Sequence, residues 1–145
     1  MVGTNTLLAL PLAFIASVAT PGFTQAAQAP TLTALSVVES GQWELKSRGI
    51  AMEKQLICVS DARVLLQPRH SGSACTRFII TNDSRVATVQ YSCPGMGSGR
   101  TMLRVETPRL VQIDSQGISG LEPFAVKLEG RRVGECGAVA SNFRR

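Results

Sequence analysis

The stretch YSCPGMGSGR, residues 91–100, separates two segments in which apolar and polar side chains alternate. Alternation with a period of two is typical of a half-buried β-strand. The glycines within the stretch leave the backbone free to reverse direction. We therefore interpret it as the central turn of an antiparallel sheet, with Cys93 as a covalent anchor. The apolar positions of the flanking segments are Ala87, Val89, Tyr91, Leu103 and Val105.

The same glycines invite comparison with a phosphate-binding loop. Such a loop presents backbone N–H groups at the start of a helix. Here the residues after Gly99 alternate as a strand does, and no G-x-G-x-x-G motif is present. The sequence therefore favours a hairpin turn.

Similar segments recur along the chain, with turn signals about every 8–12 residues. A turn is expected at residues 82–84, and a loop at 116–123. Ser60 can cap a short helix over residues 60–66, which Pro68 must end. The alternating segments predict strands over residues 41–48, 53–59, 76–81, 85–93, 101–107, 109–115 and 124–129, with residues 130–136 closing the sheet.

These elements predict a mainly β fold. We expect a curved antiparallel sheet or a small open barrel, with one short helix and two disulfides. One-sided alternation gives the sheet a single apolar face. That face has to be covered, either by curling of the sheet or by the short helix.

The N-terminal 29 residues carry no charged side chain. Residues 7–19 form an apolar run of signal-peptide length, which is short for a membrane span. We expect signal peptidase to cleave after Ala29, with Ala26 and Ala27 as alternatives. The segment before the apolar run has no Lys or Arg, which leaves an uncleaved anchor as the competing interpretation. Export with cleavage predicts a periplasmic or secreted protein without a transmembrane segment.

Cleavage at that point would leave 145 − 29 = 116 residues, enough for one domain. We predict that residues 1–29 are a signal peptide and residues 30–40 an N-terminal tether or first edge segment. Residues 41–137 form the β-rich, disulfide-stapled domain. Residues 138–145 form a frayed basic tail.

Four cysteines in an exported chain indicate two disulfides. We prefer the pairs Cys58–Cys75 and Cys93–Cys136, because the first would bracket the short helix. The main competitor is Cys75–Cys93, since these residues could face each other across the turn at 82–84. The chain has no C-x-x-C spacing, so no structural zinc site is expected.

The sequence offers little support for catalysis, and we expect no catalytic residue, metal or cofactor. The single histidine, His70, could act as a general base only for a nucleophilic serine, and the chain has no G-x-S-x-G motif that would supply one. We expect His70 to be a solvated loop residue. A pair of carboxylates could still support an enzyme, which remains a third hypothesis. Nucleic acid is not expected, because an aromatic content of 5% leaves few stacking platforms.

The net charge of +5 favours anionic partners, and most of the basic residues are arginines. Arginine suits bidentate contacts with carboxylate and phosphate groups. The side chains that we expect to meet a ligand are Met96, Arg100, Arg104, Lys127 and Arg131.

Five short stretches occur in an order that resembles the domain of unknown function 3617 family of small exported bacterial envelope proteins. The resemblance spans about residues 40–137 and implies an exported β-rich domain with paired cysteines, without catalytic residues. The segment between Arg48 and Glu53 is shorter than in the family. The stretches are GQWE at 41–44, CVSDA at 58–62, Cys75, YSCPG at 91–95 and GRRVGEC at 130–136.

The leading functional hypothesis is a non-catalytic envelope protein that binds an apolar or anionic envelope molecule. The ligand would lie on the concave face of the sheet or on its arginine-rich outer face. The alternative is a protein-interaction module, an inhibitor or assembly partner, that uses residues 95–99 or 116–123 as contact loops.

Overall fold

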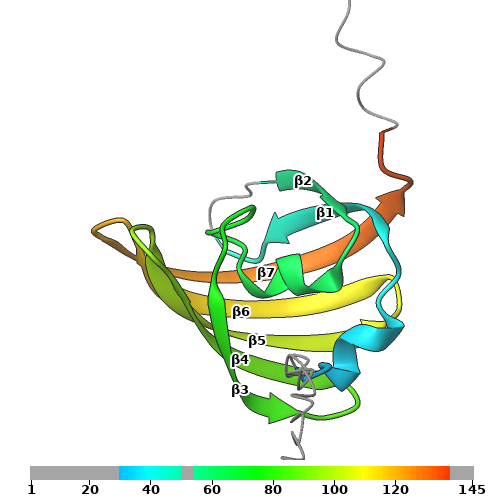
Figure 1. Ribbon diagram of the computed structural model, residues 1–145. Helices are drawn as coiled ribbons and strands as arrows, with labels where there is room; N and C mark the ends of the chain where they lie inside the picture. Colours follow the sequence, from blue (N-terminus) through cyan, green and yellow to red (C-terminus); the bar gives the residue numbers. More distant parts are fainter. Residues whose placement is uncertain (1–29, 50–53, 138–145) are drawn as a thin grey trace, which may run out of the picture.

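The computed structural model describes residues 30–49 and 54–137 (Figure 1). The predicted signal peptide at 1–29 and the predicted tail at 138–145 lie outside the described residues. The described part is a single seven-stranded antiparallel sheet in the order β2-β1-β7-β6-β5-β4-β3. This confirms the mainly β prediction, and the sheet is open, with β2 and β3 at its edges. The strands are β1 Gly41–Ser47, β2 Lys54–Val59, β3 Thr76–Asn82, β4 Val86–Cys93, β5 Gly97–Thr107, β6 Leu110–Ser119 and β7 Glu122–Gly134.

Strands β3 to β7 follow one another as consecutive hairpins. The turn predicted from the central glycines is confirmed, because Cys93 of β4 pairs with Gly97 of β5. The loop predicted at 116–123 is wrong: β6 and β7 continue through it and leave only Gly120 and Leu121 between them. Gly117 is not a loop signal but a close-approach position, since a Cβ there would lie 2.1 Å from the Ser98 carbonyl oxygen.

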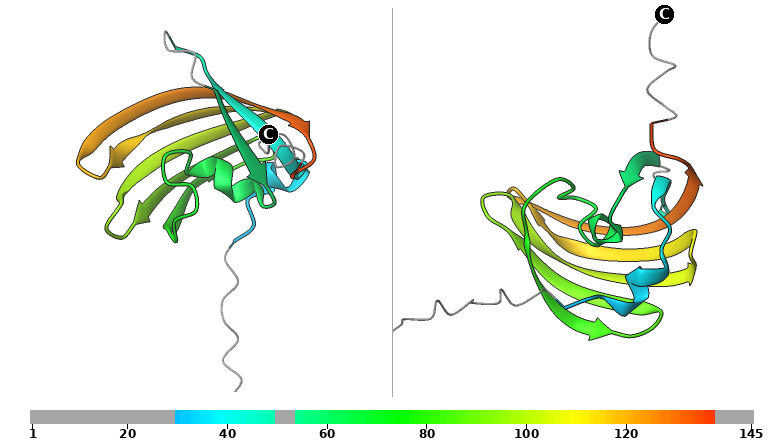
Figure 2. Two further views of the ribbon diagram at one scale, coloured as in Figure 1. Left: turned by 90° about the horizontal axis from the view of Figure 1, so that it is seen from above. Right: turned by 45° about the vertical axis from the view of Figure 1, so that its right-hand side comes forward.

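The last strand returns to the first. Strand β7 pairs with β1 along six positions, and β1 in turn forms a hairpin with β2. The connection from β2 to β3, residues 60–75, must then pass from one edge of the sheet to the other. Figure 2 shows that this connection lies on the concave side of the curved sheet.

The concave face of the sheet carries the core. Alternate residues of the strands point inward, where the 60–75 connection and the N-terminal segment cover them. The Trp43 indole is fully buried and donates from Nε1 to the Glu39 carbonyl oxygen at 3.0 Å. The most buried apolar strand residues are Trp43, Val59, Ala87, Val89, Tyr91, Leu103, Val111 and Ile113.

The N-terminal segment 30–40 is not a loose tether. Thr33–Val37 forms a short 3-10 helix, η1, and its Ala34 and Leu35 are buried in the core. Asn82 at the end of β3 accepts a hydrogen bond from the Thr33 N–H at 2.7 Å. The alternation of apolar residues is too short here to reveal that the segment packs against the sheet.

The predicted helix at 60–66 is a second 3-10 helix, η2, over Ala62–Leu66. Its cap is Asp61 and not Ser60, because the Asp61 carboxylate accepts from the Arg63 N–H at 2.9 Å. Hydrogen bonds from the Arg63 side chain lower the pKa of the Asp61 carboxyl below its usual value. Leu65 and Leu66 of η2 are fully buried, so packing on the sheet holds this short helix in place.

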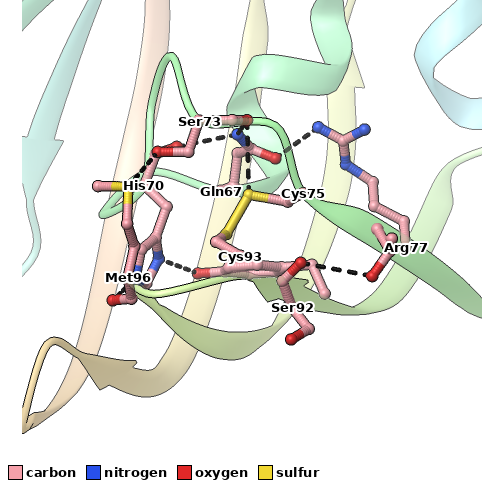
Figure 3. The surroundings of a disulfide bond; sticks show 10 residues. Gln67, His70, Ser73, Cys75, Arg77, Ser92, Cys93 and Met96 are labelled. Atoms are coloured by element: carbon pink, nitrogen blue, oxygen red, sulfur yellow. Dashed lines mark hydrogen bonds between the residues drawn. A yellow bond between two sulfur atoms is a disulfide. The ribbon is translucent and has the colours of Figure 1, made fainter.

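The disulfides are Cys75–Cys93, drawn in Figure 3, and Cys58–Cys136. The preferred pairing was therefore wrong, and the competing pair Cys75–Cys93 is correct. The register explains the first bond, because Thr76 pairs with Ser92 and the next pair outward is Cys75 with Cys93. The return of β7 to β1 explains the second. It places residue 136 beside the edge strand that holds residue 58.

Candidate functional site

The concave face keeps an unfilled hollow of about 470 Å³ between β1, β2, β7 and the 60–75 connection. Its volume falls in the range of small-molecule sites, roughly 300–1,000 Å³. We call it the concave hollow. Its lining consists of Leu45, Ser47, Lys54, Gln55, Pro68, Arg69, Ser71, Val126 and Leu128.

The lining of the concave hollow includes both apolar and basic side chains. Leu45, Val126 and Leu128 come from β1 and β7 and supply its apolar part. Arg69 supplies its charge, and no carboxylate is among the lining residues. The hollow therefore combines apolar surface with positive charge, which suits an amphipathic anion.

Arg69 and Lys54 differ in where their charges lie. Lys54 pairs with Lys46 across the β1–β2 hairpin, so its side chain lies on the outer face, where its Nζ is 3.6 Å from a Glu44 carboxylate oxygen. Arg69 forms no ion pair with any residue in the described ranges. Arg69 is thus the cation best placed to receive a ligand carboxylate or phosphate.

His70, the neighbour of Arg69, is buried, so its prediction as a solvated loop residue is wrong. Its Nε2 lies 3.1 Å from the Met96 carbonyl oxygen, and its Nδ1 lies 3.2 Å from the Tyr91 hydroxyl. A carbonyl oxygen can only accept, so Nε2 carries the proton and Nδ1 accepts from Tyr91. Both ring nitrogens are occupied inside the protein, and His70 fastens the connection to the sheet.

Gln67 holds the same loop from its other side. Its Nε2 donates to the carbonyl oxygens of His70 at 2.9 Å and Ser73 at 3.0 Å. The disulfide at Cys75 then ties the end of the loop to β4 (Figure 3). These contacts make the wall that carries Arg69 a fixed part of the concave hollow.

The interior next to this wall contains polar side chains, and their hydroxyl groups form hydrogen bonds within the protein. The Tyr91 ring lies against Gly99, where a Cβ would come within 2.5 Å of the tyrosine oxygen. Burial raises the pKa of Tyr91 above its ordinary value. Beyond it, the Thr101 and Ser115 hydroxyl oxygens share a buried hydrogen bond of 2.7 Å. These groups are closed to solvent and support the fold.

Four of the predicted ligand contacts, Arg100, Arg104, Lys127 and Arg131, lie on the outer face of the sheet, away from the concave hollow. Three of them are neutralised within the described residues: Arg104 by Glu106 at 2.8 Å, Lys127 by Asp114 at 3.7 Å and Arg131 by Glu129 at 3.1 Å. Hydrogen bonds from Arg131 and Gln112 lower the pKa of Glu129. Arg100 has no acidic partner in the described ranges.

Met96, the fifth predicted contact, lies in the turn between β4 and β5 and is 49% exposed. The sequence pattern does not reveal the lining of the concave hollow. Arg69 stands in a polar run that resembles any solvated loop, and the apolar positions at 45, 126 and 128 resemble ordinary core. The pairing of β1 with β7 brings the apolar positions together, and the 60–75 connection places Arg69 beside them.

Other site chemistry is sparse within residues 30–49 and 54–137. No group of three or more His, Cys, Asp or Glu side chains there could hold a metal ion. A second hollow lies on the outer face over β4, β5 and β6, and Asp114 is the single carboxylate in its lining. A third lies between the segments that hold η1 and η2, and Asp61 is the single carboxylate in its lining. No helix in this part of the chain is long and apolar enough to cross a membrane.

The comparisons with known proteins give a family and no function. The family described as "Protein of unknown function (DUF3617)" matches residues 38–136 of this chain. No curated protein and no solved structure matches the chain. The two disulfides are consistent with an oxidising, extracytoplasmic compartment.

Proposed function

The chain belongs to the family described as "Protein of unknown function (DUF3617)", and from that premise we propose that it is an exported, non-catalytic envelope protein whose concave hollow binds a small amphipathic anion, such as a fatty acid. The observation that carries this proposal is the lining of the hollow. Apolar side chains of β1 and β7 meet Arg69, which has no acidic partner among the described residues. The acyl chain of the fatty acid would lie on the apolar side chains, and its carboxylate would bind Arg69.

Export is supported by the signal-peptide pattern of residues 1–29 and by the two disulfides. The test is fractionation of cells that express the full gene, with the mature N-terminus read by mass spectrometry. We expect periplasmic protein that begins at Pro30. Cytoplasmic protein with an intact N-terminus would contradict export.

The non-catalytic part of the proposal concerns pairs of carboxylates, which the enzyme hypothesis requires. Glycosidase-type chemistry needs two carboxyl groups facing one cleft, about 5–10 Å apart. None of the hollows described above contains more than one.

Binding is tested by calorimetric titration with decanoate and, separately, with decanol. Arg69→Gln removes the carboxylate partner, and we expect it to weaken decanoate binding about fivefold, since an exposed charge pair contributes up to about 1 kcal/mol. Decanol binding should not change. Val126→Ser removes apolar lining and should weaken both ligands about fivefold, because about 1 kcal/mol of apolar contact is lost.

The matched control is Arg104→Gln, which removes an exposed arginine from the outer face. Its decanoate affinity should equal that of the unaltered protein. The proposal fails if decanoate does not bind, or if Arg69→Gln and Arg104→Gln behave alike.

A further inference from the structure

Two neighbouring turns form an apolar projection at one end of the sheet. In Figure 1 the turn between β4 and β5 and the turn between β6 and β7 protrude side by side. We call this projection the apolar tip. Its exposed apolar residues are Pro94, Met96, Ile118, Leu121 and Pro123, of which Leu121 is 98% exposed.

Hydrogen bonds hold the two turns of the apolar tip together. The Gly120 N–H donates to the Met96 carbonyl oxygen at 2.8 Å and so joins the two turns. The same carbonyl accepts from His70, and the Ser73 hydroxyl contacts the Met96 sulfur at 3.0 Å. These bonds keep Leu121 in solvent, where a folded protein gains nothing from a large apolar side chain.

Charges around the tip favour an anionic partner. Arg100 lies on the outer face of β5, two residue pairs away from Ser98–Ile118, and forms no ion pair within the described ranges. Arg69 lies on the inner side, next to the His70 that binds Met96. The only acidic side chain within the tip is Glu122.

We propose that the apolar tip docks into the interface of an anionic phospholipid bilayer. Leu121, Met96 and Ile118 enter the acyl boundary, while Arg100 meets the phosphate groups. Exposed apolar surface combined with basic side chains is the combination that binds peripheral proteins to such interfaces. Because Arg69 and Met96 are linked through His70, docking would bring the concave hollow toward the lipid surface. The docking itself does not require the hollow to be occupied.

The first test is cosedimentation of the full chain, as purified after export, with vesicles of phosphatidylethanolamine and phosphatidylglycerol. L121S should weaken binding roughly tenfold, because burial of a leucine side chain contributes that much or more. The matched control is V133S, which removes another exposed apolar side chain at the opposite end of β7. V133S should bind as the unaltered protein does.

Two charge variants test the electrostatic contribution to vesicle binding, and they should change the affinity in opposite directions. R100Q should weaken binding about fivefold, since each basic residue near an anionic surface contributes about that factor. E122Q should strengthen it. Vesicles of phosphatidylcholine alone should bind weakly and should not distinguish these variants.

Insertion is tested with L121W. The native Trp43 is fully buried and should not respond to lipid. The emission of the L121W variant should shift to the blue on adding vesicles and be quenched by brominated lipids. Unchanged emission would contradict insertion.

The proposal is overturned if the protein does not bind anionic vesicles, or if L121S and V133S bind equally. It is also overturned in favour of protein docking if L121S loses a partner from membrane-free extract while vesicle binding is absent. Decanoate titration of the same samples separates the two proposals, since L121S should retain full decanoate affinity.

Discussion

The Nδ1 atom of His70 lies 3.2 Å from the Tyr91 hydroxyl oxygen, and the two rings meet edge to face with centroids 5.5 Å apart. This contact joins the connection that crosses the concave face to β4, the strand next to the edge strand β3. On one side of it lies Arg69 of the concave hollow, and on the other lies Met96 of the apolar tip. Both proposed surfaces therefore depend on one buried pair.

His70→Phe should destabilise the protein by about 2 kcal/mol. The change leaves the Tyr91 hydroxyl without its acceptor and removes a donor to the Met96 carbonyl, both in the interior. Urea denaturation measures the free energy of unfolding. Tyr91→Phe is the companion, and the double variant should cost less than the sum of the single ones because the residues interact. Strict additivity would show that the pair is not coupled.

Tyr91 should titrate above the ordinary tyrosine pKa of about 10. Burial raises its pKa in the folded state, so the folded protein holds this proton more tightly than the unfolded chain does. The resulting stability is complete below about pH 10 and is lost as the pH rises through the folded pKa. The chain has a single tyrosine, so near-ultraviolet tyrosinate absorbance reports this residue alone. Ionisation at or below the ordinary pKa would contradict its burial.

Gly99→Ala should cost about 1–3 kcal/mol, the usual range for overpacking. The new Cβ would lie 2.5 Å from the Tyr91 oxygen and 2.6 Å from its Cζ, and the buried ring has little room to move. Gly134→Ala is the control, since nothing lies within 4 Å of its Cβ position. The control should change the free energy of unfolding by less than about 0.5 kcal/mol. Equal effects of both variants would contradict the packing of Tyr91 on Gly99.

The two disulfides should differ in accessibility. Cys58 and Cys136 are exposed, whereas Cys93 is 2% exposed. Mild reduction of the folded protein should therefore open Cys58–Cys136 first, as shown by alkylation and peptide mapping. Any peptide linking Cys58 to Cys75 would contradict the observed connectivity.

Their stabilising effects should follow the lengths of the loops that they close. The sequence separations are 78 for Cys58–Cys136 and 18 for Cys75–Cys93. Chain entropy assigns about 4.5 and about 3 kcal/mol to loops of these lengths. C58S/C136S should accordingly lower the free energy of unfolding more than C75S/C93S. The reverse order would show that contacts around Cys93, and not chain entropy, decide the contribution.

Local pattern was enough to predict the class of fold and most of its strands. Alternation along residues 85–93 and 101–107 depends only on the geometry of an extended chain, so it predicts β4, β5 and the hairpin between them. The same reasoning misplaced residues 116–123. The sequence does not distinguish a glycine in a loop from a glycine that allows two strands to approach closely. Gly117 allows such a close approach.

An antiparallel β domain with one apolar face is predictable from residue order, because side-chain period and turn chemistry are local properties of the chain. The pairing of β7 with β1 is visible only in the folded chain; it sets the disulfide to Cys136 and gathers Leu45, Arg69 and Val126 around one hollow. It also decided that His70 is buried. These outcomes depend on which distant segments satisfy each other's hydrogen bonds and apolar surfaces, and no local pattern contains that information.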